Sequence, residues 1–453
     1  MLFRTGCKSG LLAVFAGILL STTISFAGEK PVKVILLGID GVSKNVLEPY
    51  FERDVIPNLE SLAKKGGLGE LDSYWPLRTM QVWTSIVTGK MPGQHGIWDH
   101  VANSYYNPPE YRTKHKKVYT PADRKSKALW QLLAEKGIKS LTVGWPTTWP
   151  AEKVAPGIMV APKVLYGDER RVTIKGGFWR DIKKMVTPKK LLGRVRKSIV
   201  EPTQIKNSDL AIMADVPPKG SPLYELPKIE SYVYALRWSL ARARSVEAIT
   251  VDLAKSENPE VVLAYFQCTD SLLHRFWIFQ KSEAEIKKRL GQFGISTEHV
   301  PELKQRFEKV VEGCYRDVDE RVGRILESIG GPDTMVMIVS DHGFGDGPEK
   351  HPFKAEPYGG IHWSTGAIIA KGGKMKPDTV IQEASALDVT PTILHFLGLP
   401  VGGDMRGKVI EDLFSAEYLE KNPVKKIPTY EKEPQLEVPY EEGFPEKPES
   451  FVW

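Results

Sequence analysis

The sequence predicts an α/β protein with a largely parallel central sheet, helices on both faces and a helical insertion. Two observations predict this fold class. Apolar, mostly β-branched runs alternate with helix-period segments along most of the chain. Three of the runs lead into aspartate or histidine, and strands buried on both faces deliver functional side chains at their carboxyl ends in this way.

The length and charge of the chain limit its possible domain organisation and its possible partners. Its 453 residues suffice for one large domain or two ordinary ones, and 42% are hydrophobic, enough for a substantial core. The net charge of +6 is mild, with 62 basic and 56 acidic residues. Composition therefore does not favour a nucleic-acid polymer as a partner.

Residues 1–27 have the pattern of a secretory signal peptide. Arg4 and Lys8 precede an apolar stretch over residues 11–20, and Ser25-Phe-Ala27 has the small-x-small cleavage pattern. We therefore expect an exported protein, periplasmic or extracellular. The alternative is an uncleaved anchor, although the apolar stretch is too short to span a bilayer comfortably.

Two cysteines remain in the expected mature chain. Cys268 lies at the end of a predicted strand and Cys314 on the apolar face of a predicted helix. They can pair in an exported protein, but their positions favour two buried free thiols.

The first strand of the mature chain is predicted over Val32–Leu37 and leads to Asp40, which glycines flank. An acidic residue at such a strand end, where glycine lets the backbone approach closely, is typical of a metal or phosphate site. The alternative is an Asp-Gly turn. A helix follows over Ile56–Lys65, and Gly66-Gly67 is expected to end it.

Thr79 begins a predicted helix whose apolar stripe is Val82, Ile86 and Val87 and which Gly89 closes. A hydroxyl there faces unpaired backbone N–H groups and the positive end of the helix dipole, which suits a phosphoryl anion and stabilises an alkoxide. The alternative is a plain N-cap threonine.

The middle of the chain contains a helix over Lys127–Lys136, a strand over Ser140–Gly144 and an aromatic loop. Residues 163–229 then form a predicted helical insertion that is dense in lysine and arginine. Its basic face is expected to be solvated; the alternative is that it steers anionic substrates or touches acidic lipid. A long helix follows over Tyr232–Ala254.

A second apolar strand over Val261–Phe266 leads to Asp270 and His274. Residues four apart share one face of a helix, so this carboxylate and imidazole can hold the same ion. The amphipathic pattern over Phe307–Ile329 predicts a helix. The next strand, over Val336–Val339, runs into Asp341 and His342, a ligand pair that suits a divalent transition metal.

The last part of the predicted domain adds His362, a strand over Gly366–Ala370 and a helix over Asp388–Gly398, on which His395 is expected to be structural. Residues 416–453 are rich in proline and charge and lack periodicity. They are expected to form a surface arm or to be partly disordered.

The carboxyl ends of parallel strands meet at one edge of a sheet, so the candidate functional residues are expected to converge. Three aspartates and three histidines make six protein ligands, the right number for two metals with three ligands each and open positions for substrate. A hydroxyl between two such metals is suited to in-line displacement at phosphorus. The converging residues are Asp40, Thr79, Asp270, His274, Asp341, His342 and His362.

At this point the chain resembles the alkaline phosphatase superfamily, and within it the type I phosphodiesterase/nucleotide pyrophosphatase family. The resemblance runs from Val32 to about Phe414, outside the insertion, and implies a catalytic domain over residues 28–415. It is carried by motifs that are specific in combination, namely Gly38-Ile-Asp40-Gly41, Thr79, Ser85-Ile-Val-Thr-Gly89, Pro92-Gly-Gln-His95-Gly96, Asp270-x-x-x-His274, Ser340-Asp341-His342-Gly343 and His362.

The resemblance implies roles for these residues. One zinc would take Asp270, His274 and His362. The other would take Asp40, Asp341 and His342 and touch Thr79, which would carry a covalent phosphoryl group. His95 would be structural. Imidazole-rich ligation favours zinc over manganese.

Two departures from the family pattern bear on selectivity. The family has Phe-Pro-Asn after its threonine, whereas this chain has Met80-Gln81-Val82. The family also has a phosphate-binding asparagine where this chain has His100, which can still donate to phosphate. The chain lacks Cys-x-Pro-x-Arg, which disfavours a sulfatase with an oxidised cysteine.

These features predict an exported two-zinc phosphoesterase acting on a small phosphate ester or nucleotide, with a diester or pyrophosphate favoured over a monoester. A phosphotransferase is an alternative on the same site. The alternative from another class is a non-catalytic metal-binding envelope protein that retains the fold, which the altered residues near Thr79 would suit.

Overall fold

A computed structural model describes residues 32–74, 77–99, 102–104, 112, 114, 118–161, 182–217, 219–220, 229–346, 360–372 and 375–432. The predicted signal peptide, His100, residues 162–181 of the predicted insertion and the predicted arm beyond residue 432 lie outside these ranges. Among the described residues, no helix combines the length and the apolar character that crossing a membrane requires.

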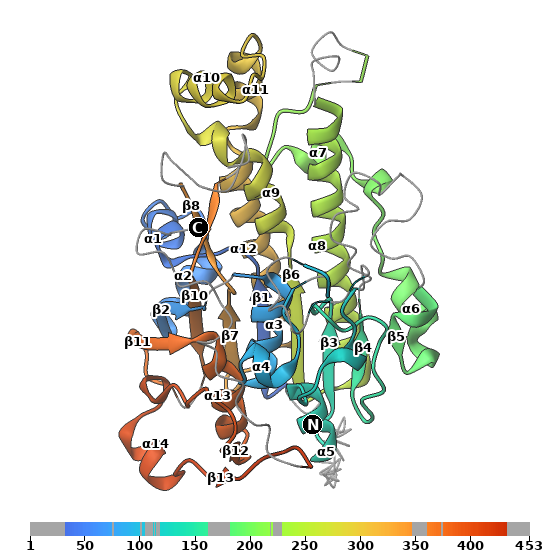
Figure 1. The fold of residues 1–453 in the computed structure, drawn as a ribbon, viewed down its shortest axis with the longest axis vertical. Coiled ribbons are helices and arrows are strands. Elements are labelled where there is room, and N and C mark those ends of the chain that lie inside the picture. Colours follow the sequence, from blue (N-terminus) through green and yellow to red (C-terminus); the bar gives the residue numbers. More distant parts are fainter. Residues whose placement is uncertain are drawn as a thin grey trace, which may run out of the picture. The chain divides into compact units, whose positions relative to one another are not determined.

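A nine-stranded sheet is the centre of the fold (Figure 1). Its strand order is β11-β2-β10-β7-β1-β6-β3-β4-β5. The bounds are β1 Val34–Ile39, β2 Gly67–Asp72, β3 Ser140–Val143, β4 Ile158–Val160, β5 Val186–Thr187, β6 Val261–Phe266, β7 Met335–Val339, β10 Thr365–Lys371 and β11 Thr379–Ser385.

The centre of the sheet is parallel, as the alternation of strands and helices predicts. Strand β1 pairs in parallel with both β7 and β6, and β3 pairs in parallel with β6 and β4. Strand β10 is antiparallel to both of its neighbours, β7 and β2. The α/β class with a largely parallel sheet is therefore confirmed.

Helices cover both faces of the sheet. One face buries its side chains against α1 (Lys44–Glu52), α2 (Pro57–Lys65), α8 (Ile229–Glu257) and α12 (Val310–Ile329). The other face packs against three further helices, whose bounds are α3 Thr79–Thr88, α5 Leu129–Glu135 and α13 Val389–Phe396. Because the central strands β1, β6 and β7 are covered on both faces, their residues are apolar without alternation.

A third hydrophobic core lies beyond the sheet, between the first half of α8 and α9 (Cys268–Phe276). Figure 1 shows the helices around it past the end of β6. Its other elements are α7 Asn207–Leu210, η6 Trp277–Gln280, α10 Glu283–Gln292, α11 Val300–Phe307 and the start of α12. This helical layer therefore draws on segments both before and after β6, and not on the predicted insertion alone.

Several short elements complete the described part of the chain. Within the insertion they include η3 Ile182–Lys184, η4 Lys189–Leu191, α6 Leu192–Lys197 and η5 Pro202–Gln204. Elsewhere they are α4 Pro92–His95, η2 Pro121–Asp123, β8 Gly343–Gly345, β9 Ile361–Trp363, η7 Ala386–Asp388, β12 Val401–Gly402, η8 Glu411–Leu413, α14 Ala416–Lys421 and β13 Lys426–Ile427.

Two elements differ from the sequence-based expectations. Gly66-Gly67 does end α2, but Gly67 also begins strand β2, where a side chain on Gly69 would collide with the backbone of Ile381 in the adjacent strand. The helix predicted over Phe307–Ile329 is α12, which begins three residues later at Val310, and a separate helix, α11, ends at Phe307.

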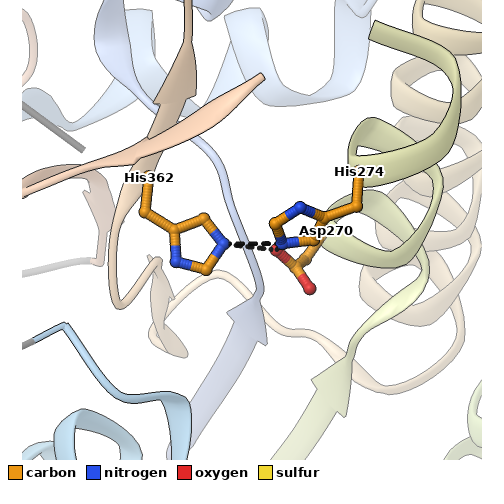
Figure 2. Close-up of side chains that lie close together, drawn as sticks. All are labelled: Asp270, His274 and His362. Carbon is orange, nitrogen blue, oxygen red and sulfur yellow. Dashed lines mark hydrogen bonds and ion pairs between the residues drawn. The ribbon is translucent and has the colours of Figure 1, made fainter. Parts of the chain in front are cut away.

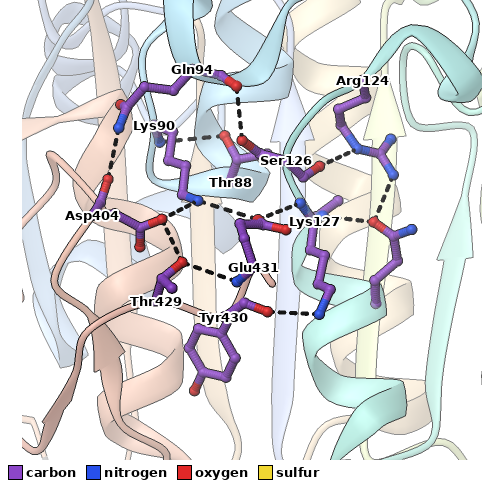
Figure 3. A network of polar contacts seen from close by, with 12 residues as sticks. Thr88, Lys90, Gln94, Arg124, Ser126, Lys127, Asp404, Thr429, Tyr430 and Glu431 are labelled. Carbon is purple, nitrogen blue, oxygen red and sulfur yellow. Dashed lines mark hydrogen bonds and ion pairs between the residues drawn. The ribbon is translucent and has the colours of Figure 1, made fainter. Parts of the chain in front are cut away.

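The beginning of the C-terminal arm is ordered against the domain. Strand β13 pairs with β12, and Glu431 accepts a hydrogen bond from Lys127 N at 2.8 Å. Lys90, immediately after the glycine that ends α3, lies 2.7 Å from Asp404 and 3.2 Å from Glu431 (Figure 3). The side chain of Lys90 is only 2% exposed, so the arm supplies a buried counter-charge.

Candidate active site

Three adjacent parallel strands deliver the candidate carboxylates. The order β7-β1-β6 brings the ends of these strands side by side, with Ile39 in register with Phe266 and Gly38 with Val339. Asp40 follows β1 directly, Asp341 follows β7 by two residues, and Asp270 lies in the first turn of α9 after β6. The sheet edge therefore collects them as the sequence predicts.

The glycine after Asp40 is required by its backbone and its surroundings. Gly41 has φ +73°, in the left-handed region, and a Cβ there would lie 3.3 Å from Cα of Asp270. Asp40 N donates to Phe266 O at 3.0 Å, which continues the β1–β6 pairing into the site.

The first candidate ligand group is Asp270, His274 and His362 (Figure 2). Nε2 of His274 and Nε2 of His362 each lie 3.1 Å from Oδ1 of Asp270, and the two nitrogens lie 2.8 Å apart. Asp270 and His274 share one face of α9, and His362 enters from β9. This is the set that the resemblance implies for one zinc.

The second candidate group surrounds His342. Its Nε2 lies 3.2 Å from Oδ1 of Asp40, 3.6 Å from Oδ2 of Asp341 and 3.8 Å from Oδ1 of Asp270. The ligand atoms that come within 4.8 Å of one another are those of Asp40, Asp270 and His342. Asp341 is beside this cluster, and Asp270 contacts both groups.

Hydrogen bonds fix the orientation of His342. Its Nδ1 lies 3.0 Å from Gly343 O and donates to it, so Nε2 is the nitrogen that faces the carboxylates. The ring stacks on His362 with centroids 3.7 Å apart and 19° between the planes. Both imidazoles thus present a nitrogen to the same small volume.

Burial and mutual repulsion shape the charges of the site. Burial, reinforced by Asp40, raises the pKa of Asp341 well above its usual range. Burial lowers the pKa of His342, but Asp341 and Asp40 outweigh it and raise that pKa to about 10. Burial and the neighbouring His342 lower the pKa of His362 to about 3. Burial opposes ionisation of Asp270, but His274 and His362 hold its pKa well below its usual range.

The two groups fit divalent cations. Oδ1 of Asp40, both carboxylate oxygens of Asp341 and Nε2 of His342 are buried and have no hydrogen-bond partner among the described residues. Orphaned buried polar atoms are costly unless something compensates them. Because these atoms are all cation-ligating types, a bound metal would satisfy them.

Thr79 is the first residue of α3 and is only 6% exposed. Two contacts tie the chain around it to the same sheet edge: Ser73 Oγ donates to Asp341 O, and Trp83 lies against Gly38 of β1. Thr79 precedes Trp83 by about one helical turn and lies at the positive end of the helix dipole.

Other residues singled out from the sequence lie away from the ligand groups. His95 is buried, accepts from Ile97 N at Nδ1 (3.1 Å) and donates from Nε2 to Ser85 Oγ (2.9 Å). His395 is buried against Phe414. Both fit structural roles. Cys268 and Cys314 are buried and free.

The site has a further member that the sequence did not indicate. Tyr265 in β6 donates from its hydroxyl to Oδ2 of Asp40. Tyr265 reads in the sequence as one more apolar strand residue, and nothing in its spacing marks it. Only the pairing of β1 with β6 reveals the contact.

A family model described as type I phosphodiesterase / nucleotide pyrophosphatase matches residues 34–384, most of the chain. The chain belongs to that family. Its members are phosphoester hydrolases, and the match spans every strand of the sheet from β1 to β11 and all six candidate ligands. The resemblance inferred from the motifs is thereby confirmed.

Two curated relatives match shorter segments. Human ectonucleotide pyrophosphatase/phosphodiesterase family member 1 is 29% identical over 124 residues, which are 26% of this chain and 13% of that protein. The 2,3-bisphosphoglycerate-independent phosphoglycerate mutase of Shewanella oneidensis is 29% identical over 111 residues, 22% of this chain and 19% of that protein. The matches thus span less than a fifth of either relative.

Solved structures resemble the fold more distantly. Murine ectonucleotide pyrophosphatase/phosphodiesterase 5, an inactive form in complex with AMP, has a TM-score of 0.47 at 11% identity, covering 84% of this chain and all of that one. BT1596, a 2-O GAG sulfatase, has a TM-score of 0.46 at 13% identity, covering 85% and 74%. Likeness at this level adds no argument about chemistry.

Proposed function

We propose that the protein is an exported, two-metal phosphoesterase that hydrolyses phosphodiester or pyrophosphate bonds through a phosphothreonine on Thr79. The observation that carries this proposal is the convergence of two cation-ligating groups, which meet at Asp270, on the sheet edge where α3 begins. Membership in a family of phosphoester hydrolases supports it.

Each ligand group would hold one cation in this proposal. Asp270, His274 and His362 would hold one divalent cation, and Asp40, Asp341 and His342 the other, zinc being favoured by three imidazoles. When bound, the cations would neutralise charge on the phosphoryl oxygens and lower the pKa of the attacking hydroxyl.

Thr79 supplies the nucleophile. Its Oγ1 forms a bond to phosphorus as the bond to the leaving oxygen opposite breaks, and its proton passes to solvent while the leaving oxygen takes up a proton. The N-terminal N–H groups of α3 face the phosphoryl anion. Water then attacks the phosphothreonine, which releases the phosphate product and restores the Thr79 hydroxyl.

The substrate class in this proposal is a small phosphodiester or pyrophosphate, such as a nucleotide derivative. His100 would donate to a phosphate oxygen. A monoesterase or a phosphotransferase would use the same groups. Both remain alternatives because the residues after Thr79 differ from the family pattern.

The decisive experiment compares wild type with Thr79→Ala at equal metal content. We expect the wild type to turn over bis-p-nitrophenyl phosphate faster than p-nitrophenyl phosphate, and the variant to retain its metal but lose at least about 10³-fold in turnover. Full turnover by Thr79→Ala refutes the role of Thr79. Faster monoester turnover by the wild type reverses the substrate preference.

Two further measurements test the alternatives. Transfer of the phosphoryl group to an added alcohol would identify a phosphotransferase. Absence of bound metal, together with no turnover of nucleotide diesters, lipid-headgroup diesters or monoesters after zinc is added, would favour a non-catalytic envelope protein.

A further inference from the structure

Tyr265 is buried beneath the candidate site, in the strand next to Asp40. It is 1% exposed, and its hydroxyl donates to Oδ2 of Asp40. The other carboxylate oxygen, Oδ1, lies 3.2 Å from Nε2 of His342 and has no hydrogen-bond partner. The Tyr265 hydroxyl therefore holds one oxygen of Asp40, while the other oxygen faces Nε2 of His342.

The ring of Tyr265 also contacts the helix that begins with Thr79. Trp83 of α3 packs edge-on against it, with centroids 4.9 Å apart and 72° between the planes. Trp83 fills the space over Gly38, where an added Cβ would lie 2.5 Å from the indole. Trp145 holds Trp83 from another side, at 5.2 Å and 89°.

These contacts connect two parts of the site that come from distant segments. Trp83 and Thr79 are four residues apart and share one face of α3. Asp40 follows Gly38, on which Trp83 rests, by two residues. The Tyr265 ring thus packs against Trp83, one helical turn after Thr79, and its hydroxyl donates to Asp40, a candidate metal ligand.

We propose that Tyr265 is a positioning residue for the reaction. Its hydroxyl holds the Asp40 carboxylate in the orientation that presents Oδ1 to a cation. Its ring, packed against Trp83, fixes the position of α3 relative to the sheet and so the position of Thr79. This inference rests on the proposed function, because it assumes a cation at Asp40 and a nucleophile at Thr79. A phenylalanine would pack equally well, so the hydroxyl is explained by the carboxylate it binds.

Outer hydrogen-bond partners of metal ligands typically contribute 10–100-fold to metal affinity. We therefore expect Tyr265→Phe to weaken zinc binding by that factor at one of two sites, measured by competition with a chelator and by equilibrium dialysis. Bound zinc should fall from two towards one per chain at intermediate zinc concentrations. Saturating zinc should restore turnover to within a few-fold of wild type.

The matched control is Tyr430→Phe. Tyr430 is also buried, and its hydroxyl donates to Pro400 O at 2.6 Å, among residues that contribute no candidate ligand. This variant loses a buried tyrosine hydrogen bond, as Tyr265→Phe does, and should bind zinc as the wild type does. Equal weakening in both variants would overturn the proposal.

The remaining outcomes separate this inference from the proposed function. If Tyr265→Phe lowers the melting temperature but binds zinc within two-fold of wild type, the residue is merely structural and the inference fails. If the wild type binds zinc but hydrolyses no ester, the proposed function fails, while weaker zinc binding by Tyr265→Phe would still support the orientation of Asp40. A wild type that binds no divalent cation overturns both.

Discussion

The Nε2 atoms of His274 and His362 lie 2.8 Å apart, and each is 3.1 Å from the same oxygen of Asp270. Two neutral imidazoles cannot both direct a lone pair at each other without repulsion unless a proton or a cation lies between them. Burial lowers the pKa of His362 to about 3 and keeps its ring neutral, so its Nε2 can accept a proton from His274 or, together with Asp270 and His274, ligate a cation.

Metal removal should therefore both inactivate and destabilise the protein. A cation that binds only the folded state at 100 times its Kd adds about 2.7 kcal/mol to the free energy of unfolding. We expect a chelator to abolish turnover and to lower the melting temperature, and zinc to restore both. A melting temperature unchanged by chelator and by added zinc would contradict the metal assignment.

His95 should give the protein a measurable dependence of stability on pH. Burial lowers its pKa to about 3, with Arg124 and Lys90 adding to the shift. The unfolded chain has the ordinary value of about 6.5 and so binds one more proton between pH 6.5 and 3. Above pH 6.5 His95 is neutral in both states, and protonation costs the folded protein no stability. Below pH 6.5 the free energy of unfolding decreases by up to about 1.4 kcal/mol per pH unit.

Urea unfolding of wild type and His95→Gln between pH 4.5 and 7.5 measures this contribution. The difference in unfolding free energy between the two proteins should be constant above pH 7 and shrink as the pH falls. His299→Gln, which replaces a histidine away from the core, is the control and should follow the wild type. A difference that does not change with pH would show that His95 is not buried in its neutral form.

Much of the fold and the candidate site could be predicted because the signals are local. Apolar runs such as Val261–Phe266 mark buried strands, and the ligands follow them within a few residues. Parallel pairing of β1 with β6 and β7 then brings the ends that carry Asp40, Asp270 and Asp341 together, whereas His362 comes from β9, outside that sheet.

The features that were missed depend on contacts between distant segments. Strand β2 (Gly67–Asp72) contains glycines that weaken any strand signal, and it forms because β10 and β11 pair with it on both sides. The arm lacks periodicity, yet Glu431 has a partner in Lys90, 341 residues earlier in the chain. The bond from Tyr265 to Asp40 likewise requires the β1–β6 register.

The buried cation at Lys90 should matter more to stability than any surface ion pair. Lys90→Met leaves the carboxylates of Asp404 and Glu431 buried without their shared cation, and removal of one partner from a buried ion pair costs about 3–5 kcal/mol. We expect a loss of that size in the free energy of unfolding from urea denaturation, with zinc affinity unchanged.

Lys408→Met is the matched control for Lys90→Met. Lys408 lies 3.4 Å from Glu383, with side chains 64% and 86% exposed, so its loss should cost less than about 1 kcal/mol. Equal stability of the two variants would mean that the C-terminal arm does not dock through Glu431 in solution.

The alternative interpretation of the basic segment, contact with acidic lipid, can be tested on the described residues of the predicted insertion. Residues 183–197 carry seven exposed cations and no acidic residue. Since the whole chain has a net charge of +6, the rest of it sums to 6 − 7 = −1. Only Arg194 within the segment has a carboxylate partner among the described ion pairs, Asp252 at 2.6 Å. Each basic residue near an anionic bilayer contributes about 1 kcal/mol, and salt screens it.

Co-sedimentation with vesicles measures this attraction. If the segment contacts acidic lipid, the protein should bind vesicles rich in phosphatidylserine or phosphatidylglycerol at low salt and release them at about 0.5 M salt, where the Debye length is only a few ångströms. It should not bind neutral vesicles. Replacing four of the segment's five lysines, those at 183, 184, 189 and 190, by glutamine should abolish binding without changing turnover of a soluble diester. Replacing the exposed lysines 408, 421, 425 and 426 instead should leave binding intact, because these residues lie outside the segment. If the two sets of substitutions weaken binding equally, the attraction reflects total charge and the segment has no special role.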